Sequence, residues 1–188
     1  MAPRPKVTKE EILNAAFNIV REQGESALTA KTLAARAGCS TQPIFWYFSG
    51  MGEVMQMITE KAKVLFSDVL RQKKEGVNPF KNLGLNYIKF AKEETNLFKM
   101  LYMSGKAEPE KLLDDENTPF AIDVIVKEKG LSEEDARRVF RELWLFSHGI
   151  ATMTATGTAR FSEEETEIML TDVYTGVLMK IKSEKTVI

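Results

Sequence analysis

The sequence predicts an all-α protein in which a three-helix N-terminal head is joined by a long helix to a C-terminal helical bundle, with about nine helices in all. Three observations support this fold class. Apolar residues recur at three- and four-residue spacing along most of the 188 residues. Helix-capping patterns precede these stretches, and glycines follow several of them. No alternating β-branched run of strand length lies between them.

The helix starts are marked by residues that can cap free backbone N–H groups. A capping box pairs a hydroxyl with a carboxylate three residues later, and the pattern occurs three times. The three boxes are Thr8…Glu11, Ser132…Asp135 and Ser162…Glu165. Two further starts place a capping side chain before a proline suited to the first helical turn, at Asn78-Pro79 and Thr118-Pro119.

The helix ends coincide with glycines at the close of the periodic stretches, which are Gly24, Gly76, Gly105 and Gly130. Together these signals predict helices at 8–23, 29–37, 41–47, 52–75, 79–94, 95–104, 117–129, 132–158 and 162–182. A short turn is also expected within 108–115.

The first three helices form the predicted head. The first presents a continuous apolar face made of Ile12, Leu13, Ala16, Phe17 and Val20. The next two are short, and their apolar stripes lie on either side of Gly38-Cys39-Ser40. The second stripe consists of Ile44, Phe45 and Phe48, which we expect to be core residues. Two short helices joined by a glycine-containing turn are the plan of a helix-turn-helix, whose second helix enters the DNA major groove.

The composition is typical of a soluble protein of a reducing cytoplasm. The chain is 44% hydrophobic and 28% charged, which favours a folded globule over disorder. No apolar run is long enough to span a bilayer, and the start MAPRPKVTKEE lacks the apolar core of a signal peptide. The single cysteine excludes an internal disulfide and a multi-cysteine metal site. We therefore expect a cytoplasmic protein with no membrane partner.

Charge gives a weaker indication. The net charge is −1, but residues 1–50 carry six Lys and Arg side chains against four Glu, a local charge of +2. This mild asymmetry fits either chance or a DNA-facing head. A dimer would present the basic end twice, which strengthens the attraction to phosphates.

The head resembles the N-terminal domain of the tetracycline-repressor (TetR) family of bacterial transcription regulators. The pattern ILNAAFNIVREQG…LTAKTLAARAGCSTQPIFWYFSGMGEV carries the resemblance over about residues 9–57. A lone helix-turn-helix is a weak signal, whereas this extended order of core, glycine, Leu-Ala, Ala-Gly and aromatic residues is a strong one. The resemblance implies a DNA-binding domain at 1–51 and an effector-binding and dimerisation domain at 52–188.

Five candidate DNA-binding residues lie at the helix starts of the head. Thr29 and Ser40 are placed to cap the second and third helices, which leaves free N–H groups near the DNA backbone. Thr41, Gln42 and Pro43 lie in the first turn of the third helix, where side chains reach base edges. Gln42 can bind adenine in a bidentate manner, and Pro43 offers an apolar surface to a thymine methyl group.

Three further candidates, Lys31, Trp46 and Tyr47, are expected to meet phosphates; for Trp46, packing on the protein surface is the alternative. The chain departs from the family pattern at three places. The usual tyrosine is Phe45, which lacks a hydroxyl for phosphate, and the usual histidine is Tyr47, which keeps a donor. The lysine common near the start of the fourth helix is missing from residues 49–52.

The last two predicted helices, 132–158 and 162–182, favour a dimer. The stripe of the second, which includes Ile168, Val173 and Val177, is wider than one neighbour within the chain requires. Such a stripe is typical of a four-helix dimer interface, and the resemblance implies a homodimer through these helices. Packing within one chain is the alternative.

An effector site is the remaining expectation for the C-terminal part. Trp144 and His148-Gly149 resemble the Trp–His–Gly signature of one subgroup of regulators, and His148 either orients an effector or is a buried structural histidine. The other candidate ligand-binding residues are aromatic: Phe66, Tyr87, Phe98, Tyr102 and Phe120. Aromatic and Met side chains suit an adaptable pocket for a small apolar or amphipathic effector, but also an ordinary core.

Catalysis is not expected. A di-iron bundle needs Glu-x-x-His pairs, but Leu145 stands three residues before the only histidine, His148. Zinc ligands, a Walker loop and a dinucleotide glycine motif do not occur, so no metal, cofactor or catalytic residue is predicted. The expected function is a repressor whose dimer binds a palindromic operator and is released by an effector. The alternative is a helical ligand-binding or interaction protein without sequence-specific DNA binding.

Overall fold

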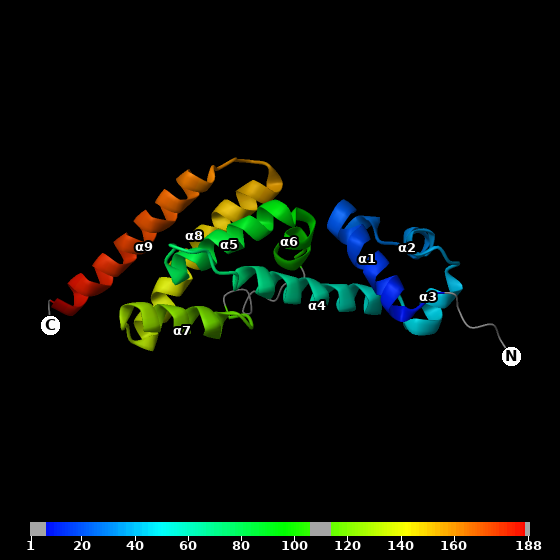
Figure 1. Cartoon of the computed structure of the whole chain (residues 1–188), viewed down its shortest axis with the longest axis horizontal. Coiled ribbons are helices and arrows are strands. Elements are labelled where there is room, and N and C mark those ends of the chain that lie inside the picture. Colours follow the sequence, from blue (N-terminus) through cyan, green and yellow to red (C-terminus); the bar gives the residue numbers. More distant parts are fainter. Residues whose placement is uncertain (1–6, 106–113, 187–188) are drawn as a thin grey trace. The chain divides into compact units, whose positions relative to one another are not determined.

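The computed structural model describes residues 7–105 and 114–186, and within them the chain is helical with no strand (Figure 1). The α-helices are α1 (Lys9–Gln23), α2 (Ala30–Ala37), α3 (Gln42–Tyr47), α4 (Met51–Leu70), α5 (Pro79–Glu93), α6 (Thr95–Tyr102), α7 (Thr118–Lys129), α8 (Glu133–Thr156) and α9 (Glu163–Thr186). A short 3-10 helix, η1 (Glu25–Ala27), follows α1. The all-α prediction is confirmed. The turn expected within 108–115 falls mostly on 106–113, outside the described residues.

The chain divides into two compact units. Unit 1 consists of Met1–Phe66 with Glu94–Gly105, and unit 2 of Ser67–Glu93 with Lys106–Ile188. The division therefore falls within α4, and α6 belongs to unit 1 although it follows α5 in sequence. The functional boundary at residue 51 stays a prediction.

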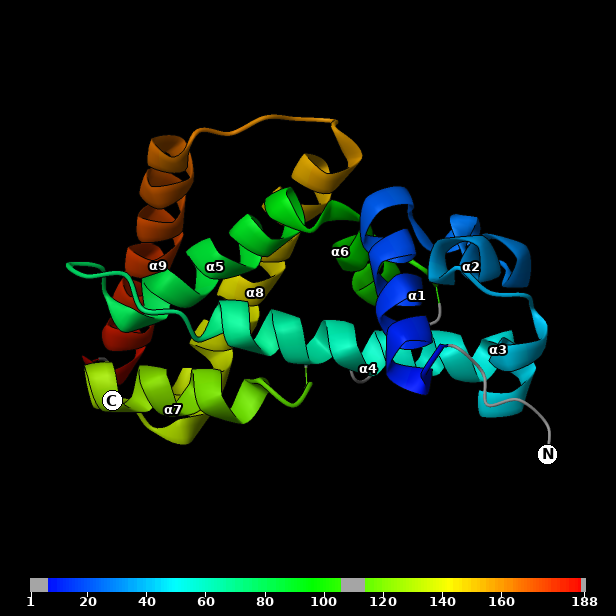
Figure 2. The same cartoon turned by 45° about the vertical axis from the view of Figure 1, so that its right-hand side comes forward.

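The core of unit 1 lies beneath α1. Ile12, Ala16 and Val20 recur on one face of this helix and are fully buried, as are Leu33 of α2 and Ile44 of α3. Helix α1 packs against α2, α3 and α6 (Figure 2). Burying this apolar face is what holds the two short helices in place, because helices of eight and six residues are not stable alone.

Helix α6 is tied to the end of α1 by polar contacts. Arg21 Nε donates to Glu94 Oε2 at 2.6 Å, and a second guanidinium nitrogen pairs with the other carboxylate oxygen. Asn96 Nδ2 donates to the backbone carbonyl of Arg21 at 3.0 Å. The bidentate geometry fixes α6 against α1 more specifically than a single ion pair would.

Three of the predicted helix starts are confirmed in full. Thr8 forms a capping box with Glu11 on α1, and Ser162 pairs reciprocally with Glu165 on α9. Asn78 Oδ1 accepts hydrogen bonds from two backbone N–H groups in the first turn of α5, each at 3.1 Å. These caps satisfy N–H groups that have no partner within their helices.

Two other starts differ from prediction. Ser132 Oγ accepts from the Asp135 N–H at 3.2 Å, but Asp135 bonds back to the Ser132 hydroxyl rather than to its backbone. Thr118 was expected to cap α7 and is instead its first helical residue. The Asp115 carboxylate supplies the cap, accepting from the backbone N–H groups of Asn117 and Thr118 at 2.8 and 3.0 Å.

Helix α4 ends at Leu70, five residues before the predicted end at 75. The reason is a cap supplied by α5. Asn86 Nδ2 donates to the carbonyls of Leu70 and Gln72 at 3.1 and 2.7 Å, and Asn82 also donates to the Gln72 carbonyl. These buried amides satisfy carbonyls that further helix would have used.

Unit 2 is built around α5 and α8, which pack closely along their length, with α7 and α9 against them (Figures 1 and 2). The helices approach closely at Gly84 of α5. A Cβ atom there would lie 3.2 Å from Ser147 Oγ of α8 and 3.3 Å from both Leu170 Cδ atoms of α9. Three helices therefore meet where a side chain is absent.

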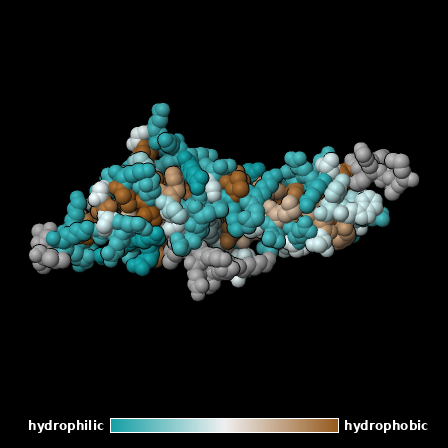
Figure 3. All heavy atoms as spheres, turned by 90° about the horizontal axis from the view of Figure 1, so that it is seen from below, coloured by the Kyte–Doolittle hydropathy of each residue, from teal (hydrophilic) through white to brown (hydrophobic). Residues whose placement is uncertain are grey.

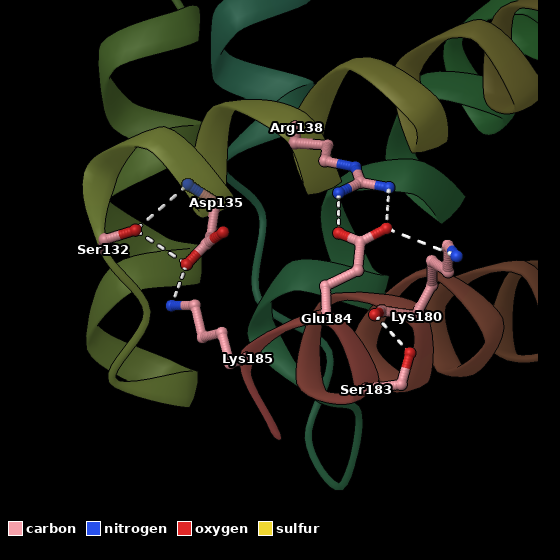
Figure 4. Close-up of polar contacts among 7 residues, drawn as sticks. All are labelled: Ser132, Asp135, Arg138, Lys180, Ser183, Glu184 and Lys185. Atoms are coloured by element: carbon pink, nitrogen blue, oxygen red, sulfur yellow. Dashed lines mark hydrogen bonds and ion pairs between the residues drawn. The ribbon is translucent and has the colours of Figure 1, made fainter. Parts of the chain in front are cut away.

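The start of α8 lies beside the end of α9, and ion pairs join them (Figure 4). Arg138 Nη1 donates to Glu184 Oε2 at 2.6 Å, and Lys185 pairs with Asp135. These contacts hold the pKa of the Asp135 and Glu184 carboxyls below their usual values, chiefly through the hydrogen bonds from Lys185 and Arg138 respectively. Because Arg138, Glu184 and Lys185 are 39%, 44% and 58% exposed, the pairs align α8 with α9 more than they stabilise the unit.

No helix in the described part of the chain is both long and apolar enough to cross a lipid bilayer. Hydrophilic residues dominate the face drawn in Figure 3, with separate apolar areas among them. The large hydrophobic side chains with the most exposed surface are Phe45, Trp46, Val64, Met103, Phe120, Leu145, Met153, Ile168 and Met179.

Candidate nucleic-acid interface and effector region

The turn between α2 and α3 has the geometry expected of a helix-turn-helix. Thr29 caps α2: its hydroxyl accepts from the Thr32 N–H at 3.1 Å, and the Thr32 hydroxyl accepts from the Thr29 N–H at 2.9 Å. Helix α2 ends at Gly38, whose left-handed backbone (φ 66°) turns the chain toward α3. Glycine adopts this conformation without the strain that a Cβ would cause.

The cap predicted for α3 is wrong. Ser40 was expected to cap this helix, but α3 begins at Gln42 and the capping position is Thr41. Thr41 already has helical backbone angles, and its side chain makes no capping hydrogen bond. A capping side chain normally needs an extended backbone to reach back to the first N–H groups, which Thr41 lacks.

Two residues of α3 occupy positions opposite to those predicted. Pro43 is buried, so it cannot offer its ring to a thymine methyl group. Phe45, expected in the core, has 52% of its surface exposed. The cause is helix geometry: Ile44 and Phe48 lie four residues apart and share the buried face, whereas Phe45 is turned about 100° away from Ile44.

The exposed side of α3 and its start consists of Thr41, Gln42, Phe45 and Trp46, and none of them carries a charge. Gln42, Phe45 and Trp46 stand at positions i, i+3 and i+4, so they are neighbours on one helix face. Phe45 is the one member of this set that the sequence analysis does not place on the exposed side. Its three-residue spacing from Gln42 indicates that the two residues share a helix face.

Tyr47 has a partner within the chain. Its half-buried hydroxyl donates to the backbone carbonyl of Val7 at 3.3 Å, across 40 residues. A hydroxyl has one proton to donate, so a phosphate would compete with this bond. Lys31 is exposed on α2, so burial does not prevent its ammonium group from reaching a phosphate.

The start of α4 carries an acidic side chain where the family's lysine is missing. Glu53 Oε2 accepts from the backbone N and the hydroxyl of Ser49 at 2.7 and 2.9 Å, and Lys9 Nζ lies 3.7 Å from its other oxygen. The hydrogen bonds from Ser49 lower the pKa of Glu53. This carboxylate engages the Ser49 N–H just before the helix and places a negative charge at the helix start, which would repel a phosphate there.

The candidate effector residues fall into two groups, one in each unit. In unit 1, the Tyr102 ring lies 5.5 Å from that of Phe66 in an edge-on arrangement and 5.2 Å from that of Phe98. Phe66 and Phe98 are buried. Aromatic pairs at these distances stabilise a core, so within unit 1 these residues are packed against one another.

In unit 2, Tyr87, Trp144 and His148 form an aromatic cluster between α5 and α8. The Trp144 and His148 rings are stacked with centroids 4.7 Å apart, and Tyr87 Oη lies 2.9 Å from His148 Nδ1. Burial lowers the pKa of His148, and burial with the nearby Asp115 charge raises that of Tyr87. The cluster is therefore neutral at pH 7.

Phe120 lies apart from this cluster as a surface residue. Its ring is 36% exposed and packs under the Arg71 guanidinium, 5.1 Å from the ring centre. Unit 2 also has clefts of about 760 Å³ and about 340 Å³, and neither is lined by any of the four candidate effector residues of this unit. The described residues hold no group of three or more His, Cys, Asp or Glu side chains that could bind a metal ion.

Two family models match the chain. Residues 12–58 match the bacterial regulatory proteins of the tetR family, and residues 80–173 match the tetracyclin repressor-like C-terminal domain. A comparison with curated protein sequences found no significant match.

Solved structures share the fold at low sequence identity. A TetR-like transcriptional regulator from Rhodococcus sp. RHA1 is 14% identical with a TM-score of 0.57, and the match covers 91% of this chain and 95% of that one. TetR from Acinetobacter baumannii AYE is 15% identical, with a TM-score of 0.61 and coverage of 95% and 98%. A variant of the latter, solved in complex with minocycline, is 14% identical with a TM-score of 0.59 and coverage of 91% and 96%.

These likenesses show the fold, and the two family models together span the helix-turn-helix, α5 and most of the C-terminal helices. The family binds DNA as dimers and binds small-molecule ligands. The resemblance to the Trp–His–Gly subgroup stays a prediction. The chain belongs to the TetR family of bacterial transcriptional regulators.

Proposed function

We propose that the protein is a transcriptional repressor whose dimer binds a palindromic operator through α3 and releases it when a small effector binds unit 2. The observation that carries the DNA-reading part is the uncharged, exposed face of α3, with Gln42 at its start. The buried Ile44 and Phe48 support this face from below and fix its orientation within the head. Chromosomal DNA as the target also implies a cytoplasmic location.

Within the operator, Gln42 is the candidate for base recognition because its amide can bind adenine in a bidentate manner. Lys31 and the Trp46 indole N–H are candidates for phosphate contacts, which add affinity without reading sequence. We assign Tyr47 to the support of this surface, since its hydroxyl bonds to Val7 next to α1. In a dimer, two copies of α3 would read half-sites about 35 Å apart.

For the effector, we propose the surroundings of Tyr87, Trp144 and His148. Their rings supply apolar contact area, and the Tyr87–His148 pair supplies hydrogen-bonding groups, which together suit a small aromatic or amphipathic molecule. The related Acinetobacter regulator in complex with minocycline is consistent with a ligand of this kind. An effector releases DNA only if it binds the released conformation more tightly than the DNA-bound one.

The test is selection of bound duplexes from a random-sequence DNA pool by the full-length protein, followed by gel shifts of variants on the selected duplex. Gln42→Ala should weaken binding by about tenfold or more, because each bidentate base contact contributes about 1–3 kcal/mol of discrimination. Gln56→Ala is the matched control, since Gln56 is also an exposed glutamine but belongs to α4 rather than to α3.

A small-molecule screen on the selected complex then tests release. Enrichment of a palindrome together with a loss confined to Gln42→Ala supports the proposal. A pool in which no sequence is enriched would instead support the alternative, a helical ligand-binding protein without sequence-specific DNA binding.

A further inference from the structure

The exposed face of α3 presents two aromatic rings side by side. Phe45 and Trp46 have 52% and 54% of their surface exposed, although both belong to a six-residue helix whose other aromatic residue, Tyr47, is half-buried. Exposed aromatic surface of this size on a short helix is unfavourable in water. In a nucleic-acid-binding head it indicates a surface that becomes covered when DNA binds.

Phe45 is held firmly in this exposed position. Ile44, which precedes it, and Phe48, the C-cap three residues later, are anchored in the core with 0% and 2% of their surface exposed. Rotating Phe45 inward would drive Ile44 out, so the ring cannot be buried by a local rearrangement. It stands one turn after Gln42 on the same face.

The chemistry of the Phe45 ring limits what it can contact. Phenylalanine has no hydrogen-bonding group, so it can bind neither a phosphate oxygen nor the donors and acceptors of the base edges. The major groove offers one apolar group, the C5-methyl of thymine. Trp46 differs because its indole N–H can reach a phosphate.

We propose that Phe45 reads a thymine methyl group in each half-site, beside the base that Gln42 contacts. This inference rests on the proposed DNA-reading role of α3. Phe45 then acts as a specificity-determining residue, in the role that the buried Pro43 cannot fill. The family's tyrosine hydroxyl is absent at this position, so the ring contributes sequence recognition in place of a phosphate contact.

The experiment removes the methyl group without changing base pairing. A duplex selected by the wild-type protein from random DNA is prepared with thymine or with deoxyuridine at the half-site positions. The wild-type protein should bind the deoxyuridine duplex about fifteenfold more weakly, because one buried methyl group in each of two half-sites contributes about fourfold. Phe45→Ala should bind both duplexes equally, at about the wild-type affinity for the deoxyuridine form.

Two further variants make the result specific. Phe45→Tyr keeps the ring and should retain most of the thymine preference, which also covers the case in which Phe45→Ala does not fold. Val64→Ala is the control, because Val64 is an apolar residue of the same unit with 62% of its surface exposed, and it should keep the full wild-type preference.

The inference is overturned if wild-type protein binds the two duplexes equally, or if Phe45→Ala keeps the wild-type preference for thymine. It also falls if the thymine preference persists in Phe45→Ala but disappears in Gln42→Ala, since Gln42 would then carry it. These results all occur with specific DNA binding intact. A failure of the proposed function is distinct, because selection would then enrich no sequence at all.

Discussion

At the residue scale, His148 is the side chain whose protonation state and tautomer follow most directly from its surroundings. Burial favours its neutral form, and the Tyr87 hydroxyl, whose own pKa is raised, keeps its proton and can donate it to His148 Nδ1. The ring proton then resides on Nε2. Stacking on Trp144 holds the ring in the same orientation.

The first prediction concerns the pH dependence that this arrangement creates. Below about pH 6.5 His148 binds a proton in the unfolded chain more readily than in the folded chain, because burial lowers its folded-state pKa. The stability that neutral His148 contributes is therefore complete above about pH 6.5 and is lost as the pH falls below that value. NMR titration of the single histidine should give a pKa below 6.5. The free energy of unfolding should decline between pH 7 and pH 5.5.

Carboxylates also titrate at low pH, so the histidine contribution is measured as a difference. His148→Gln cannot be protonated, and its free energy of unfolding should fall less over the same range than that of the wild type. A histidine pKa at or above 6.5, or identical slopes for the two proteins, would show that folding does not favour the neutral form of His148.

The same scale shows where residue-level prediction succeeds. Ile44 and Phe48 were identifiable as core because their four-residue spacing matches a helix face, and both are buried. Phe45 and Pro43 differ from the prediction because hydrophobicity alone does not give the angle that each position occupies around α3. The Tyr47 hydroxyl donates to the Val7 carbonyl, which lies 40 residues away, so no local sequence pattern predicts this hydrogen bond.

At the element scale, most helices could be predicted because their starts and apolar stripes are local signals. The end of α4 could not be, since it depends on Asn82 and Asn86 of the next helix. Asparagine within a helix has no sequence signature that distinguishes a cap for another helix from a solvent-exposed side chain. The place of α6 in unit 1 has the same origin, because it follows from the packing of α6 against α1, which includes the contact of Glu94 with Arg21.

The second prediction tests the meeting of α5, α8 and α9 at Gly84. Gly84→Val would place its branched side chain against Ser147 and Leu170, whose atoms already lie 3.2–3.3 Å from an ideal Cβ. Because this contact is made by packed interior atoms, the variant should lose about 1–3 kcal/mol of unfolding free energy in urea titration. The loss outweighs the general gain that any side chain gives over glycine within a helix.

Gly52→Ala is the matched control for Gly84→Val. Gly52 also lies in a helix, and no atom stands within 4 Å of an added Cβ. It should be neutral or more stable by up to about 1 kcal/mol, as expected from helix propensity alone. Equal effects at the two positions would mean that α5 does not approach α8 and α9 as closely as the structure describes.

At the scale of the whole molecule, α8 and α9 carry large apolar side chains that are more than half exposed among the described residues. Ile168 and Met179 of α9 are 53% and 65% exposed, and Leu145 of α8 is 52% exposed. Ile168 and Met179 are separated by three helical turns and so share one face. Their exposure supports the proposal that the family's dimer forms here through α8 and α9, and it argues against packing within one chain alone.

The last prediction follows from this face. Ile168→Glu combined with Met179→Glu should convert the dimer into a monomer, raising the dimer dissociation constant by about a hundredfold or more, because each interface would bury unpaired carboxylates. Analytical ultracentrifugation measures the change directly.

Operator affinity should fall with it, since a monomer engages one half-site and loses the effective concentration that links the two. Val64→Glu introduces one carboxylate at a similarly exposed apolar position of unit 1 and should leave the dimer intact. If the double variant sediments as the wild-type dimer, a different surface joins the subunits, and the exposed face of α8 and α9 needs another occupant.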